Sequence, residues 1–271
     1  MYFIDKIVRL PMPFQLRAAL YWMTNIFLGK KRFLRAKTDL EKSVMRDLQI
    51  NGYAVIDSLV DIDVGNILSQ LEGCFLEEEM SDTTDTGDHI GAPSGITYAN
   101  ISDLLKKESV ISFCEHPLLL DIADQYLGCR SKIAGVASWR SRSVGDRSSN
   151  AQLFHRDLDA LKWLKVFIYL TDVTDQNGPH VYVKKSHKLN KFLSFRRIRD
   201  DEIASSELEE VHIKGRKGTV ILADSFGLHK GLAPKEGHRA ILQATYCRDR
   251  LFMTAYPKNS QLTGPRWKFF N

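Results

Sequence analysis

The sequence has no apolar run long enough to cross a membrane. None of its stretches reaches the length of about eighteen apolar residues that a transmembrane helix needs, and the N-terminus lacks the basic, apolar and small-residue order of a secretory signal. Internal repeats and low-complexity tracts are also missing. With 271 residues, of which 44% are hydrophobic and 26% charged, the chain is expected to be soluble and to bury a sizeable core.

Cysteine is scarce and scattered. The four cysteines, at positions 74, 114, 129 and 247, include no Cys-x-x-Cys pair. This spacing indicates neither a disulfide framework nor a thiolate zinc site, and a reducing compartment suits it best. We therefore predict a cytoplasmic protein.

Net positive charge is confined to the N-terminus. Residues 1–40 carry eight Lys/Arg against Asp5 and Asp39, a net charge of +6, whereas the rest of the chain has a net charge of −1. Apolar residues over 14–28, ahead of Lys30-Lys31-Arg32, predict an amphipathic helix that packs on the rest of the protein. Weak docking on an anionic membrane surface or an acidic carrier protein is the alternative. Nucleic acid is disfavoured, because the basic cluster is short and has no base-reading motif.

The most informative motif is Phe154-His155-Arg156-Asp157, followed by Leu228-His229-Lys230-Gly231 and then Arg239. His155 and Asp157 stand two residues apart, so on an extended segment they project to the same side, and His229 would complete a three-ligand face. Two histidines and one carboxylate are the ligand set of non-haem iron, which leaves positions open for a bidentate co-substrate and O₂. A His-x-Asp alone is a weak signal, so its context decides.

That context consists of β-type runs and turns in a fixed order. A long β-type run over 164–173 is followed by a turn signal and by a Ser-His-Lys segment. The succession resembles the phytanoyl-CoA dioxygenase family of Fe(II)/2-oxoglutarate-dependent oxygenases over about residues 45–250. The segments that carry the resemblance are Asn51-Gly52-Tyr53-Ala54-Val55-Ile56, His155-Arg156-Asp157, Tyr169-Leu170-Thr171-Asp172-Val173, Asn177-Gly178-Pro179, Ser186-His187-Lys188 and the spacing from His229 to Arg239.

The resemblance implies an α+β fold, a double-stranded β-helix (jelly-roll, cupin-like barrel) with flanking N-terminal helices. The order of helices before strands agrees with this class. We expect a basic appendage over 1–40 and an oxygenase domain over 41–271. Within the domain we predict helices over Asp61–Glu79 and Ile101–Leu127, the second interrupted near His116-Pro117 and ended by Gly128, with strands from Ile133 onward.

The resemblance also implies a set of cofactor-binding residues. It assigns Fe(II) to His155, Asp157 and His229, with 2-oxoglutarate and O₂ as co-substrates. Arg239 begins a β-type run in which it shares one face with Ile241, Gln243 and Thr245. A buried arginine needs a partner, and the C5 carboxylate of 2-oxoglutarate would supply one, although a structural salt bridge is the alternative.

Three further residues are candidates for co-substrate binding. In the run 163–172, one face carries Lys165 and Tyr169 among aromatic and polar residues and is expected to line the cavity. The other face is aliphatic and is expected to pack beneath helices. Gln152, just ahead of the ligand motif, is the third candidate. Plain core or edge roles are equally compatible with the pattern, because register across a bulged barrel is uncertain from sequence. His180 and His187 straddle another predicted strand and are weaker candidates.

The predicted reaction is hydroxylation of an unactivated C–H bond of a small molecule or conjugated metabolite, with release of succinate and CO₂. Asp157 favours hydroxylation over halogenation, since related halogenases have a small residue in place of the carboxylate. Desaturation and ring formation stay open. Two rival functions are a catalytically silent jelly-roll binding module, associated with a membrane or carrier through the basic N-terminus, and a zinc hydrolase with the same three ligands.

Substrate identity is only weakly indicated. A polar loop over 81–94 and the adjacent segment 95–100 are expected to shape the pocket together with Arg140 and Arg142. These arginines favour an anionic or acyl-conjugated substrate, with a surface role as the alternative. At Lys184-Lys185 the chain departs from the Pro-Gly pair that is common in the family, so we expect a changed turn at the barrel rim.

Overall fold

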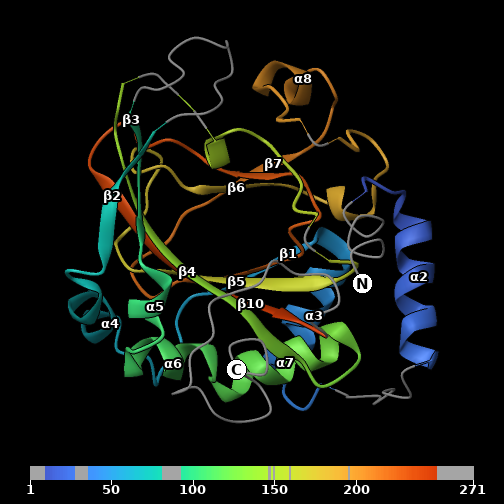
Figure 1. Cartoon of the computed structure of the whole chain (residues 1–271). Coiled ribbons are helices and arrows are strands. Elements are labelled where there is room, and N and C mark those ends of the chain that lie inside the picture. Colours follow the sequence, from blue (N-terminus) through green and yellow to red (C-terminus); the bar gives the residue numbers. More distant parts are fainter. Residues whose placement is uncertain are drawn as a thin grey trace.

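The computed structural model describes residues 10–27, 36–80, 93–145, 148, 150–158, 160–194 and 196–248. Two antiparallel sheets face each other as the two walls of a jelly-roll barrel (Figure 1). The larger sheet has the order β1 (Tyr53–Ile56), β8 (Val220–Ala223), β5 (Trp163–Tyr169), β10 (His238–Cys247), β4 (Lys132–Arg142), β3 (Pro93–Ala99) and β2 (Phe75–Met80). The smaller sheet has the order β7 (Glu210–Ile213), β6 (His180–Val183) and β9 (His229–Gly231). The predicted fold class is therefore confirmed.

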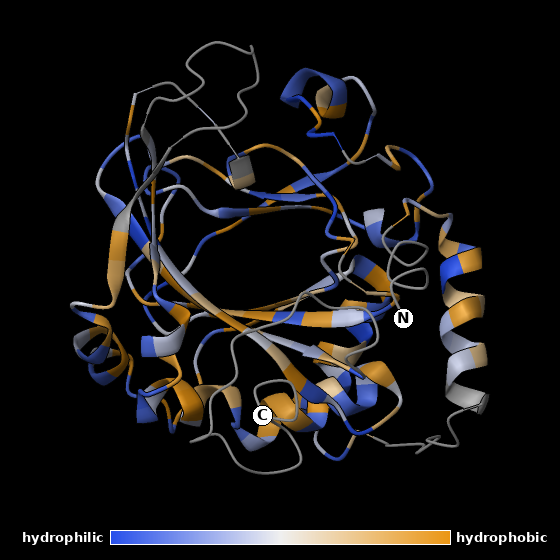
Figure 2. Cartoon of the chain, viewed as in Figure 1, coloured by the Kyte–Doolittle hydropathy of each residue, from blue (hydrophilic) through white to orange (hydrophobic). Residues whose placement is uncertain are grey.

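Helices cover the outer face of the larger sheet, whereas α8 lies beyond the smaller sheet (Figure 1). The helices are α2 (Phe14–Phe27), α3 (Asp39–Asn51), α4 (Val64–Leu71), α5 (Ile101–Leu104), α6 (Glu108–Cys114), α7 (Pro117–Leu127) and α8 (Asp200–Ala204), with short 3-10 turns η1 (Asn150–Gln152) and η2 (Ser186–Lys188). Hydrophobic residues concentrate where α3 and α7 meet the sheet, and α8 is mainly hydrophilic (Figure 2). A domain boundary after residue 40 would fall inside α3, which begins at Asp39. The division of the chain at that residue stays a prediction.

Alternation along β5 explains how the sheet separates a core from a cavity. Leu164, Val166 and Ile168 are fully buried in the main core, together with residues of α7. Burying a side chain of this size stabilises the fold by about 1.5–3 kcal/mol. Phe167 and Tyr169 face the other way, into the space between the sheets. The predicted division of this strand into an aliphatic face and an aromatic face is therefore confirmed over 164–169, whereas Trp163, expected on the aromatic face, packs in the main core.

Glycines end the helices that precede the barrel. Gly128 has φ +66° and closes α7, as expected, and Pro117 stands in the first turn of that helix. Gly52 has φ +90° and closes α3 directly before β1. The predicted helical region over 101–127 is confirmed, with an additional break between α5 and α6.

The predicted helix over 61–79 is wrong in its second half. α4 ends at Leu71, and Gly73 has φ +81°, a left-handed conformation that stops the helix. Residues 75–80 then form β2, so the run of three glutamates lies on a strand. The predicted loop over 81–94 falls mostly outside the described residues. The adjacent segment 95–100 lies largely in β3, from which Ile96 and Tyr98 line the cavity between the sheets, as expected of a segment that shapes the pocket.

The N-terminal helix packs on the barrel, as expected. The Tyr21 hydroxyl of α2 donates a hydrogen bond to the Leu127 carbonyl at 2.7 Å, and Arg17 is buried against the ring of Phe226. The basic residues 30–32 lie outside the described residues. Within the described ranges, no helix combines the length and the apolar character needed to cross a bilayer.

Candidate functional site

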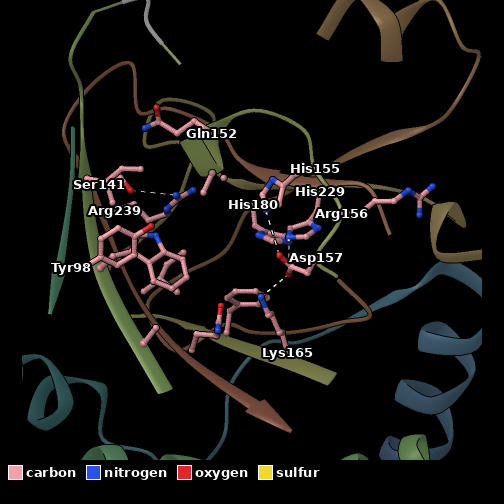
Figure 3. A pocket seen from close by; sticks show the side chains of 18 of the residues that line it. Tyr98, Ser141, Gln152, His155, Arg156, Asp157, Lys165, His180, His229 and Arg239 are labelled. Carbon is pink, nitrogen blue, oxygen red and sulfur yellow. Dashed lines mark hydrogen bonds and ion pairs between the residues drawn. The ribbon is translucent and has the colours of Figure 1, made fainter. Parts of the chain in front are cut away.

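Three predicted metal ligands meet in the cavity between the two sheets (Figure 3). His155 pairs with His229 of β9, and each backbone N–H donates to the carbonyl of the other, at 3.0 and 3.1 Å. Two residues further on, the backbone N–H of Asp157 donates to the Ser225 carbonyl at 2.9 Å. These backbone bonds bring one ligand atom from each side chain within 4.8 Å of the other two.

Hydrogen bonds fix the orientation of both imidazoles. Nδ1 of His155 lies 2.8 Å from the Leu153 carbonyl, and Nδ1 of His229 lies 2.9 Å from the Gly227 carbonyl. Each Nδ1 therefore carries a proton and donates it, which leaves the Nε2 lone pair free. Both Nε2 atoms approach the carboxylate of Asp157, at 3.7 and 3.5 Å. This backbone support is typical of histidines that bind a metal ion.

The protonation states also suit a divalent cation. Burial lowers the pKa of His155 and of His229, so both rings are neutral near neutral pH. Burial alone would raise the pKa of Asp157, but Lys165 and the two histidines outweigh it and hold that pKa well below its ordinary range. Two neutral imidazoles and an ionised carboxylate are the donor set that Fe(II) requires, so the residues present fit the metal.

Lys165 contacts the metal-binding carboxylate. Its Nζ lies 2.6 Å from Oδ2 of Asp157 and projects from β5 into the cavity (Figure 3). This contact occupies one carboxylate oxygen and leaves Oδ1 facing His155. Binding of co-substrate by Lys165 stays a prediction.

Arg239 is a buried cation that lines the same cavity. Its side chain is 2% exposed and projects from β10, as the alternation with Ile241 and Gln243 predicts. Nη1 donates to the Gly178 carbonyl and Nη2 lies 3.4 Å from the Ser141 hydroxyl, whereas Nε has no acceptor among the described residues.

No carboxylate among the described residues pairs with Arg239, so the alternative of a structural salt bridge finds no partner there. Burial lowers the pKa of Arg239, because a charge removed from water is destabilised. A carboxylate ligand would offset that cost.

The cavity has a volume of about 490 Å³. Gln152 is buried in its wall, and its contact with the co-substrate stays a prediction. Tyr169 does not line the cavity. Its hydroxyl donates to the Ile213 carbonyl at 2.6 Å and accepts from the backbone N–H of His180 at 2.9 Å, so it ties β5 to the smaller sheet.

Two further residues line the cavity: His180, only a weaker candidate from the sequence, and Arg197, which the sequence does not indicate. His180 stacks on His229, with ring centroids 5.7 Å apart, and its Nε2 has no partner within the described part of the chain. Arg197 lies beside the metal ligands, because Ile198 pairs with Phe154 in a β-bridge. His180 could be recognised only from its pairing with β9, whereas Arg197 stands in a basic run that gives no sign of which residue turns inward.

Arg140 and Arg142 do not line this cavity. The guanidinium of Arg140 lies 4.0 Å from the ring centre of Phe75, and both arginines border a separate hollow on the outer side of β4. Trp139 alternates with them and faces the metal site. The expectation that these two arginines shape the substrate pocket is therefore wrong, and the alternative surface role holds.

The turn that departs from the family pattern keeps a left-handed residue. Lys185 has φ +65°, a conformation that favours glycine, and its backbone N–H donates to the Asn51 carbonyl at 2.8 Å. The lysine side chain is exposed. A residue with a Cβ atom thus occupies a position at which strain is expected.

A family model described as phytanoyl-CoA dioxygenase (PhyH) matches residues 48–236, which is more than half of the chain. The matched range contains all three predicted metal ligands and ends shortly before Arg239. A comparison with curated proteins gives no match.

Solved structures with the same fold come from several enzymes. The epimerase SnoN from nogalamycin biosynthesis superposes with a TM-score of 0.59 at 16% identity, over 76% of this chain and 82% of that one. The carbocyclase SnoK from the same biosynthesis gives 0.57 at 21% identity, over 77% and 84%. EctD from S. alaskensis with 2-oxoglutarate and 5-hydroxyectoine gives 0.57 at 17% identity, over 85% and 87%. At these identities the likeness shows the fold.

Proposed function

This chain belongs to the phytanoyl-CoA dioxygenase family of Fe(II)/2-oxoglutarate-dependent oxygenases, and we propose that it hydroxylates an unactivated C–H bond of a small molecule. It is an enzyme of the non-haem iron class, for which Fe(II), 2-oxoglutarate and O₂ are the cofactor and co-substrates. The observation that carries the proposal is the convergence of His155, Asp157 and His229 in a cavity that also holds a buried arginine, for which the described part of the chain offers no carboxylate partner.

The side chains divide the work of holding iron and co-substrate. His155 and His229 would bind Fe(II) through Nε2, and Asp157 through the oxygen that Lys165 leaves free. Bound Fe(II) supplies the oxidation in which one oxygen atom of O₂ enters the substrate as a hydroxyl and the other enters succinate, with release of CO₂. Arg239 would hold the C5 carboxylate of 2-oxoglutarate away from bulk water, where a charge-assisted hydrogen bond is strong.

The remaining co-substrate candidates take different positions. Gln152 is buried in the cavity wall, which supports a direct contact with 2-oxoglutarate. Lys165 would act through Asp157, by fixing the orientation of the carboxylate. Tyr169 would act at a distance, by bracing the two sheets on either side of the cavity.

We propose further that the substrate carries a negative charge, recognised by Arg197. This side chain lines the cavity, and it makes no hydrogen bond or ion pair with another described residue, whereas the neighbouring Arg196 pairs with Glu202 at 2.5 Å. Arg156 does not compete for the role. Its guanidinium points away from the metal ligands in Figure 3 and donates to backbone carbonyls, including that of Ser186 at 2.9 Å.

The charges of the cavity support an anionic substrate. Asp157 balances Lys165, and the charges of Fe(II) and 2-oxoglutarate cancel. Arg239 and Arg197 then leave an excess of positive charge that an anionic substrate would offset. The neighbours in fold include an epimerase that was solved with nogalamycin RO and EctD, which was solved with 5-hydroxyectoine, so the fold itself does not choose the substrate.

The catalytically silent alternative is not favoured. A binding module has no use for a complete ligand set or for a desolvated arginine above it, and each of these features is costly to keep. The zinc hydrolase alternative gives Arg239 no role. The complete ligand set, with its carboxylate, supports hydroxylation over halogenation.

The test is anaerobic reconstitution with Fe(II) and 2-oxoglutarate, followed by addition of O₂ and measurement of succinate. We expect iron-dependent formation of succinate by the wild-type protein and none by His155→Ala, which also loses the metal. Circular dichroism of the variant checks that the fold is retained. Absence of 2-oxoglutarate turnover together with tight zinc binding and esterase activity would reverse the assignment.

Two features of the structure support proposals about the cellular compartment of the protein and its contact with membranes. All four cysteines are buried and none forms a disulfide, which supports a reducing, cytoplasmic compartment. Leu16, Trp22 and Met23 of α2 are exposed, which supports weak membrane-surface contact through residues 1–40. Co-sedimentation with phosphatidylserine vesicles would test this contact. A Trp22→Ser variant that sediments as well as the wild type would count against it.

A further inference from the structure

A second cavity of about 250 Å³ lies between α2 and the barrel. It shares no lining residue with the cavity of the metal site. In Figure 1, α2 stands alongside the barrel, at the end of the molecule away from β2 and β3. The walls of the cavity are largely apolar and include Phe14, Ala18, Leu48 and Leu161.

Among the described residues, two desolvated cations and one carboxylate face this cavity, and the exposed Lys188 also lines it. Arg17 is 5% exposed, with its guanidinium carbon 3.3 Å from the ring centre of Phe226 and Nη2 4.0 Å from Asp224. Its Nη1 atom has no acceptor among the described residues. Lys162 Nζ donates to the Tyr126 carbonyl at 2.6 Å, and burial lowers the pKa of Lys162 to about 8.

The single carboxylate does not satisfy both cations. Asp224 already accepts from the Tyr126 hydroxyl at 2.5 Å and from the backbone N–H of Phe226 at 3.1 Å. Among the buried groups Arg17, Lys162 and Asp224, one positive charge is therefore left over in a largely apolar enclosure. An unpaired buried charge is costly unless a ligand of opposite charge completes the site.

We propose that this pocket binds a small organic carboxylate with a compact apolar body, whose carboxylate is received by Nη1 of Arg17. The apolar walls would accommodate the body, and one negative charge matches the excess among the buried groups. A volume of 250 Å³ corresponds to about eight water volumes, so a ligand with roughly eight non-hydrogen atoms fits.

The pocket is connected to the metal site through the turn at residues 224–227. The Ser225 carbonyl accepts from the backbone N–H of Asp157, and the Gly227 carbonyl accepts from Nδ1–H of His229. Phe226, between them, carries the guanidinium of Arg17 on its ring. A ligand that orders Arg17 and Asp224 would therefore also stabilise the turn that positions two metal ligands, and the coupling is reciprocal.

Calorimetric titration with hexanoate, which has eight non-hydrogen atoms, tests the proposal. The full-length protein is first loaded with Ni(II) and 2-oxoglutarate, so that the metal-site cavity is filled. We expect saturable binding at one site, and we expect Arg17→Met to raise the dissociation constant by about tenfold or more, as loss of a hydrogen bond to a charged group implies. Arg216→Met removes a charge from an exposed site far from the pocket and should bind hexanoate like the wild type.

A second variant, a neutral analogue and a metal titration complete the test. Lys162→Met should weaken binding even if Arg17→Met proves too unstable to measure. Neutral hexanamide should bind at least tenfold more weakly than hexanoate, and hexanoate should lower the dissociation constant of Ni(II) in the absence of 2-oxoglutarate. No saturable binding of hexanoate to the wild type would overturn the site, and equal binding of hexanamide or inorganic phosphate would overturn its ligand class. Binding without an effect on Ni(II) would refute the coupling. None of these results depends on oxygenase turnover.

Discussion

A Cβ atom at position 231 would lie 2.7 Å from Nη2 of Arg239, so the missing side chain of Gly231 makes room for the guanidinium in the cavity. Glycine is therefore needed at this position to leave space for the Arg239 side chain, and not for an unusual backbone conformation. Gly231→Ala should displace Arg239 and raise the KM for 2-oxoglutarate by about tenfold to a hundredfold, the effect of weakening a hydrogen bond to a charged group. Succinate formation at varied 2-oxoglutarate measures this change.

The same assay on Arg239→Met gives the largest rise in the KM for 2-oxoglutarate that is expected, because this variant lacks the guanidinium altogether. Gly65→Ala is the matched control. Gly65 lies exposed on α4, and a Cβ there would meet only the Asp63 carboxylate at 3.2 Å. A normal KM in Gly231→Ala, with the fold retained, would contradict the assigned position of Arg239.

The metal ligands could be predicted because their geometry is local. His155 and Asp157 lie two residues apart, and strand alternation alone puts them on one side. The direction of Arg239 followed from the same alternation. Arg140 was misplaced because the alternation does not say which of two faces is inward, and in β4 Trp139 takes the inner face.

The remaining errors concern long-range packing and backbone conformation. Phe75 fits the helical spacing of the residues before it, but the left-handed Gly73 intervenes, and β3 offers a partner for a strand. The proximity of His180 to His229 arises from pairing between β6 and β9. The inward position of Arg197 arises from a single β-bridge. These contacts join residues that are far apart in the sequence, so no local sequence pattern predicts them.

Arg197 should decide affinity for substrate without affecting affinity for co-substrate. Arg197→Gln keeps a polar side chain but removes the charge, so the KM for an anionic substrate should rise by about tenfold, as expected for loss of a hydrogen bond to a charged group. The dissociation constant of 2-oxoglutarate, measured on the Ni(II) protein, should stay unchanged. Arg196→Gln, one residue away but paired with Glu202 outside the cavity, is the control. An equal loss in both variants would point to a general surface-charge effect instead.

The left-handed residue at the barrel rim predicts a gain in stability. Lys185→Gly removes the Cβ atom that disfavours φ +65°, and the relief should exceed the added entropy of the unfolded chain, for a net gain of about 0.5–1 kcal/mol. Urea unfolding followed by circular dichroism measures the change. Lys185→Ala keeps a Cβ atom and should give no such gain, so equal stabilisation by both variants would exclude backbone strain as the cause.

Lys162 should give the stability a pH dependence on the alkaline side. Its pKa is about 8 in the folded protein and has an ordinary value of 10.5 in an unfolded chain. Between these values the unfolded state binds more protons than the folded state, so the free energy of unfolding rises with pH, by at most about 1.4 kcal/mol per pH unit.

Lys162→Met removes the titrating group and keeps an apolar stem against Tyr126. The wild type should therefore gain stability relative to Lys162→Met as the pH rises from 8 to 10.5. Below pH 8 the lysine is charged in both states, and the difference should level off. Urea unfolding of both proteins across this range measures the difference, in which contributions from other titrating groups cancel. A difference that stays constant with pH would show that the ammonium group of Lys162 is not desolvated beneath α2.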